Sequence, residues 1–166
     1  MPIADIEKEL RARDPVRADV VAFLQNPWFK PGTDQRVIRL YMECASYRRM
    51  VLALSATGRA LMEAFGDFYC QIWWDNACPL PGQERAASFP PDVEHIREVV
   101  KRLKPKIVLC FGRSAEIGFR QVGGAMPMTC CHPMAHGDRR EELRLFAERV
   151  RRQVEFFDLM REGASR

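Results

Sequence analysis

Two runs of apolar residues dominate the sequence: Asp19-Val-Val-Ala-Phe-Leu-Gln25 and Lys106-Ile-Val-Leu-Cys-Phe-Gly112. Each has the length of a β-strand and is rich in β-branched and aromatic residues, which favour extended backbone. Strands that lack polar alternation are typical of a parallel sheet covered by helices on both faces. The two runs therefore predict the buried centre of an α/β domain.

Two further runs predict the outer strands: Phe68-Tyr-Cys-Gln-Ile-Trp-Trp74 and Met126-Pro-Met-Thr-Cys-Cys-His132. Pro127 cannot donate to a neighbouring strand, so the last run suits a strand start or a sheet edge. Apolar residues at helical spacing predict helices over residues 3–12, 34–65, 91–104, 114–121 and 138–162, the second broken near Ser46 or Ser55. This alternation predicts a three-layer sandwich, with a roughly four-stranded parallel sheet flanked by helices.

The length and composition indicate a single domain. A chain of 166 residues can bury one core, so we expect one domain over 1–166, with an N-terminal helical extension over 1–17 and a C-terminal helix over 138–162. No apolar run approaches the roughly 20 residues that cross a bilayer, and the N-terminus lacks the apolar core of a secretory signal. We therefore expect no membrane association, and a monomer.

The cysteines and the charge add little about partners. Six cysteines show neither a CxxC pair nor the spacing of a disulfide scaffold, which favours reduced thiols and a cytoplasmic location. The net charge of +4 is mildly basic. Many basic residues fall in 138–162, where acidic residues interleave, a pattern typical of a solvated helix face.

The segments that follow the four predicted strands carry the polar and aromatic residues. They are Gln25-Asn-Pro-Trp-Phe-Lys30, Asp75-Asn-Ala-Cys-Pro79, Gly112-Arg-Ser-Ala115 and His132-Pro-Met-Ala-His-Gly137. In an open parallel sheet, ligands bind beyond the carboxyl ends of the strands. We therefore expect these segments to converge on one cleft.

The same segments resemble a known family. Gln25-Asn-Pro-Trp28, together with His132-Pro-Met-Ala135, resembles the two signature motifs of the uracil-DNA glycosylase superfamily. Lys104–Gly112 followed by Ser114-Ala115, and Asn76-Ala-Cys-Pro79 before a Pro/Gly-rich loop, are similar to the segments between them. The resemblance covers roughly residues 18–136, in the right order. It implies an enzyme that flips uracil or another deaminated base out of DNA and hydrolyses its N-glycosidic bond.

The resemblance also implies roles for individual residues. Asn26 orients the attacking water, and His132 donates a hydrogen bond to the leaving base. Asn76 reads the base edge, because an amide offers both a donor and an acceptor. The remaining implied contacts are to the flipped base (Gln25, Trp28, Phe29) and to DNA (Lys30, Arg113, Ser114, Met134, Arg139). No cofactor and no metal is expected.

Three departures from the family pattern support an alternative. Leu24 stands where the family usually has glycine, and Met134 and Ala135 replace serine and proline. The alternative is a glycosylase-like protein that binds nucleic acid with weak or no activity. A doubly wound nucleotide-binding protein ranks last, because GxGxxG and GxxxxGK[ST] are missing.

Plainer interpretations of single residues also stay open. Asn76 has the residue type of a turn, and His132 that of a structural residue at a strand end. Cys130, Cys131, His132 and His136 suggest zinc. Adjacent residues on a regular strand point to opposite faces, however, so Cys130 and Cys131 are not expected to share an ion.

Overall fold

The computed structural model of the chain describes residues 3–82, 89–124, 126–134 and 139–163. Within these residues, one sheet contains the strands β1 (Val20–Leu24), β2 (Trp73–Asn76), β3 (Ile107–Phe111) and β4 (Met128–Cys130). The strand order is β2-β1-β3-β4, and every neighbouring pair is parallel. The predicted α/β class and parallel sheet are confirmed.

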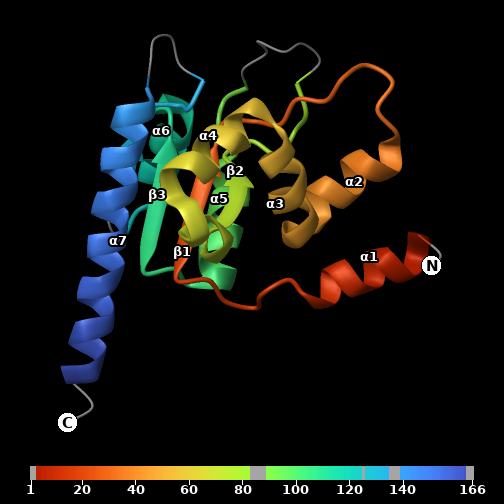
Figure 1. Cartoon of the computed structure of the whole chain (residues 1–166). Coiled ribbons are helices and arrows are strands. Elements are labelled where there is room, and N and C mark those ends of the chain that lie inside the picture. The colour runs from red at the N-terminus through yellow and green to blue at the C-terminus, as the bar shows by residue number, and fades with distance from the viewer. Residues whose placement is uncertain (1–2, 83–88, 125, 135–138, 164–166) are drawn as a thin grey trace.

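Side chains of the sheet alternate between two cores, one on each face. Val20, Ala22 and Leu24 pack with residues of α4 (Ala56–Phe65) and α7 (Arg140–Gly163). Val21 and Phe23 pack with residues of α5 (Val93–Leu103) and α6 (Arg113–Val122). Both faces are therefore covered, which explains why β1 and β3 contain no polar residue (Figure 1).

The predicted helical segment 34–65 forms three helices rather than two. They are α2 (Gln35–Glu43), α3 (Ala45–Leu54) and α4, with breaks at Cys44 and Ser55. The first break has a tertiary cause: the carboxylate of Asp14 accepts the backbone N–H groups of Ala45 and Ser46, at 2.8 and 2.7 Å. Asp14, which is some 30 residues away in the chain, thus caps the N-terminus of α3.

The second predicted strand is placed too early. Residues Gly66–Gln71 form a 3₁₀ helix, η1, and β2 begins only at Trp73. Within this segment Tyr69 is buried, whereas Cys70 and Gln71 are exposed. Tyr69 stacks on Trp74, with ring centroids 5.0 Å apart, and its carbonyl accepts the Trp74 indole N–H at 3.0 Å. As a consequence, Asn76 is the last residue of the strand rather than part of the following loop.

The two terminal helices lie where they were expected. α1 spans Ile3–Ala12 and is linked to α2 by an ion pair between Arg11 and Glu43. α7 crosses the β3–β4 side of the sheet, and its C-terminal part extends beyond the sheet (Figure 1). No helix in the described ranges is long and apolar enough to cross a membrane.

Candidate active site

A cavity of about 690 Å³ lies at the carboxyl edge of the sheet. The segment after β1, the last residue of β2 and the segment after β4 line it. α2 and the junction of α3 and α4 close its other side. The sequence-predicted residues in its lining are Gln25, Asn26, Trp28, Phe29, Lys30, Asn76, His132 and Met134. Three of the four segments expected to converge on one cleft therefore do so, whereas no residue of the fourth, Gly112-Arg-Ser-Ala115, is part of the lining.

The chain after β1 is held in place by main-chain bonds. The N–H groups of Ala77, Cys78 and Gly82 donate to the carbonyls of Leu24, Gln25 and Pro27 at 2.6, 2.9 and 2.9 Å. These bonds continue the β1–β2 pairing past the ends of the strands. The segment 25–28 is therefore a fixed extension of the sheet edge.

Asn76 is buried, with 3% of its surface exposed, and its side chain faces a defined partner. Its Nδ2 donates to the hydroxyl of Tyr41 at 3.2 Å. Tyr41 lines the same cavity, and the ring of Phe29 meets it edge-on at 5.2 Å. Within the described residues, the second N–H and the carbonyl oxygen of this amide remain available to a ligand. This burial at a strand end contradicts the interpretation of Asn76 as a turn residue.

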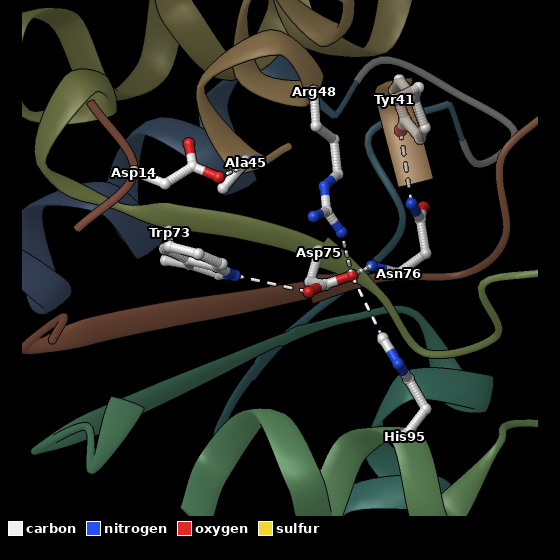
Figure 2. Close-up of polar contacts among 8 residues, drawn as sticks. All are labelled: Asp14, Tyr41, Ala45, Arg48, Trp73, Asp75, Asn76 and His95. Carbon is white, nitrogen blue, oxygen red and sulfur yellow. Dashed lines mark hydrogen bonds and ion pairs between the residues drawn. The ribbon is translucent and has the colours of Figure 1, made fainter. Parts of the chain in front are cut away.

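A buried ionic network supports the strand end that carries Asn76 (Figure 2). The carboxylate of Asp75 accepts from Arg48 Nη1 at 2.5 Å and from the Asn76 backbone N–H at 2.8 Å. His95 Nε2 lies 3.2 Å from the same oxygen, and Trp73 Nε1 donates to the other oxygen at 3.3 Å. Burial alone would raise the pKa of Asp75, but the charge of Arg48 and the hydrogen bonds of His95 and the Asn76 N–H outweigh it and lower the pKa to about 2. Asp75 is therefore ionised at neutral pH and joins β2 to α3 and α5.

His132 enters the cavity from the segment that follows β4. Its Nδ1 accepts the backbone N–H of Met134 at 3.2 Å. A neutral imidazole that accepts at Nδ1 carries its proton at Nε2. Burial lowers the pKa of His132, which favours this neutral form. The ring therefore offers an uncharged N–H donor at the cavity.

Gly112 lies beside this histidine. It follows β3 with a φ of +92°, and a Cβ added there would lie 3.4 Å from the Cβ of His132. Its N–H donates to the carbonyl of Cys130 at 2.8 Å, so β3 and β4 stay paired up to the site. The added Cβ would make an ordinary contact, so it is the positive φ that favours glycine at this position.

Three predicted DNA contacts lie outside the cavity lining. Arg113 is exposed at the start of α6, and the Ser114 hydroxyl donates to the Phe89 carbonyl at 3.3 Å. Arg139 is paired with Glu142 at 3.0 Å. Ala135 and His136 fall outside the described residues.

Sequence reasoning missed the residues that support the site: Tyr41, Arg48, Asp75 and His95. Only Asp75 left a signal, as a charged residue next to two tryptophans in an otherwise apolar run. The partners from α2, α3 and α5 are defined by the fold and carry no local pattern.

The expectation that Cys130 and Cys131 cannot face one ion is wrong. β4 ends at Cys130, so the alternation of a regular strand does not reach Cys131. Both Sγ atoms and a carboxylate oxygen of Glu142 lie within 4.8 Å of one another. Within the described residues, this group has the ligand types that hold a metal ion.

Comparisons of the chain with protein-family models, curated proteins and solved structures find no match.

Proposed function

We propose that the protein is a DNA glycosylase that excises uracil or another deaminated base by base flipping and hydrolysis of the N-glycosidic bond. One observation carries the proposal: Asn26, Asn76 and His132, from three separate segments, line one cavity at the carboxyl edge of a parallel sheet. Its volume falls in the range of about 300–1,000 Å³ that small-molecule sites have. The proposal also rests on the resemblance of these segments to the glycosylase motifs.

The base would be read at the inner end of the cavity. The Asn76 amide can donate to O4 of uracil and accept from N3–H, a pattern that cytosine does not match. Because Tyr41 holds the amide by a hydrogen bond, its orientation is fixed before the base enters. Phe29 and the partly exposed Trp28 offer aromatic faces for stacking, and Gln25 lies beside them in the lining.

The chemistry needs stabilisation of charge more than a strong base. As the bond between the sugar C1′ and the base nitrogen breaks, negative charge develops on the base and positive charge on the sugar. The Nε2–H of His132 would donate to a carbonyl oxygen of the leaving base, where charge appears in the transition state. Asn26 would position the water that adds to C1′. An amide takes no proton, so the water releases its proton to solvent or to the departing base.

DNA would be held at the rim of the cavity. Lys30 and Met134 are exposed there, and Arg113 lies exposed at the start of α6. A cation at the rim can pair with phosphate, and an exposed apolar side chain can fill the space left by a flipped base. Ser114 and Arg139 are proposed as further contacts to the backbone.

The decisive experiment is an incubation with oligonucleotides that each carry one deaminated base, followed by alkaline cleavage at abasic sites. The proposal expects strand cleavage for at least one of these bases by the parent and a strong loss for His132→Ala. Absence of cleavage for all of them, with DNA binding retained, would instead support a glycosylase-like binding protein. The side chain of Leu24 in the cavity lining, where the glycosylases usually have glycine, is the observation in favour of that second candidate.

A further inference from the structure

We propose that Cys130, Cys131 and Glu142 form a binding site for a thiophilic divalent metal ion, Zn²⁺ being the ion that fits. Cys130 is the last residue of β4, Cys131 follows it, and Glu142 lies in the first turn of α7. The two Sγ atoms and a carboxylate oxygen are within 4.8 Å of one another. The site lies outside the lining of the cavity and does not depend on the proposed glycosylase activity.

The spacing is close to what zinc requires. With Zn–S distances of about 2.3 Å, two sulfur ligands of a tetrahedral ion lie about 3.8 Å apart. The three ligand atoms therefore need to approach by no more than about 1 Å, which side-chain rotation can supply. Two thiolates and one carboxylate select zinc over magnesium or calcium, because the latter prefer oxygen ligands throughout.

Both thiols keep their protons beside the carboxylate of Glu142. Burial, followed by the neighbouring Cys131 and Glu142, raises the pKa of Cys130 to about 12. Burial and Glu142 also raise the pKa of Cys131, whose thiol hydrogen-bonds the carboxylate. Two protons thus occupy the place of a cation between three potential anions.

Zinc binding exchanges the two thiol protons for the metal ion. One Zn²⁺ replaces the two thiol protons, and the ligand set of two thiolates and a carboxylate leaves a net charge of −1 on the complex. Arg139, paired with Glu142 at 3.0 Å, supplies a compensating positive charge beside it. A proton release of two per zinc at neutral pH is the expected signature.

The site is open to solvent and joins two elements. Cys130 and Cys131 are half-buried and Glu142 is exposed, so an ion can enter and keep water as its fourth ligand. Bound there, the ion would fasten the end of the edge strand β4 to the start of α7. Because Cys131 directly precedes His132, the ion would also restrict the segment that carries the histidine.

The test uses the reduced, metal-free full-length protein without DNA. Co²⁺ is titrated as the spectroscopic probe, Zn²⁺ is used to displace it, and calorimetry in two buffers counts the protons released. The proposal expects a sulfur-to-cobalt charge-transfer band that saturates at one equivalent and two protons released per Zn²⁺. A hundredfold excess of Zn²⁺ over its Kd should raise Tm by about 8 °C.

Matched variants identify the ligands. Cys131→Ser should weaken Zn²⁺ binding by about 100-fold or more, whereas Cys70→Ser, at an exposed cysteine of η1, should leave it unchanged. Glu142→Gln, at an exposed position where misfolding is not expected, should weaken binding by about tenfold, and Glu141→Gln should not. No charge-transfer band at one equivalent, or equal losses for Cys70→Ser and Cys131→Ser, would overturn the proposal.

Discussion

His132 is the residue on which the proposed chemistry depends most. An Nε2–H donor to the leaving base strengthens as the bond breaks, so it raises turnover more than binding. We expect His132→Ala to fold and bind DNA but to lose about 10²–10³ in single-turnover excision. Asn26→Ala should cost less, because an amide only positions water. NMR of the histidine ring should also show the proton at Nε2 and a pKa below the usual value, for which burial is the cause.

An Nδ1–H tautomer, or equal single-turnover rates for the parent and His132→Ala, would remove this residue from the mechanism. Unfolding of His132→Ala would instead support the interpretation of His132 as a structural residue at the strand end.

Asn76 is expected to select the base. Asn76→Asp exchanges the amide donor for an acceptor-only carboxylate, which opposes O4 of uracil but can accept from the amine of cytosine. We expect uracil excision to fall by about 10²–10³ and some cytosine excision to appear. The control, Asn76→Ala, should lose excision of both bases. Uracil excision at the parental rate in Asn76→Asp would mean that the amide does not read the base.

At the scale of elements, Asp75 connects β2 to α3 and α5 through its contacts with Arg48 and His95. Asp75→Asn leaves Arg48 buried with an uncompensated charge, and we expect it to lower the free energy of unfolding by about 3–5 kcal/mol in urea denaturation. Glu94→Gln, which breaks the exposed pair with Arg97, should change it by no more than about 1 kcal/mol. Similar losses for the two variants would show that the Asp75 network adds nothing beyond a surface ion pair.

The same network predicts a pH dependence. The pKa of Asp75 in the folded protein is about 2, below the ordinary 3.8, so the folded state holds its proton less tightly than the unfolded state. The stabilisation is complete above the unfolded pKa and is lost as pH falls toward 2. The difference in stability between the parent and Asp75→Asn should therefore shrink over this range.

The break between α2 and α3 can be tested through Asp14. Its carboxylate accepts two backbone N–H groups at the start of α3, a bond pattern that a helix cap normally provides from the adjacent residue. We expect Asp14→Ala to lower the free energy of unfolding by about 1–2 kcal/mol. Asp158→Ala, at an exposed carboxylate of α7, should change it by less than about 0.5 kcal/mol. A loss no larger than this control would mean that Cys44 and its neighbours start α3 unaided.

These elements also show what the sequence could and could not predict. The runs around Val20–Leu24 and Ile107–Phe111 were identifiable because burial on both faces requires uninterrupted apolar residues. Phe68 to Gln71 was misassigned because its aromatic residues and its buried Tyr69 have the composition of a strand, although the backbone forms a 3₁₀ helix. The partners of Asp75 and Asp14 come from segments some 20–30 residues away in the chain, so no local pattern identifies them.

For the whole molecule, the candidate chemistry lies at the carboxyl edge of the sheet. Lys30 lies on the rim of the cavity and Arg113 at the carboxyl end of β3. Arg161 instead lines a separate hollow with Asp19 and Lys106, which precede β1 and β3. A net charge of only +4 makes general attraction to DNA weak, so the position of each cation should determine its contribution.

DNA binding should therefore weaken with salt, and unequally among cation variants. Each phosphate contact releases condensed counterions, which contributes about −0.9 to the slope of log K against log salt for duplex DNA. We expect Lys30→Ala and Arg113→Ala each to reduce the magnitude of this slope by about 1, whatever the DNA sequence, and Arg161→Ala to leave it unchanged. The measurement is a series of binding isotherms between about 50 and 200 mM salt. An isotherm that salt does not change would exclude phosphate contacts, and an equal effect of Arg161→Ala would place the DNA away from the cavity, where Asn76 and His132 cannot reach the base.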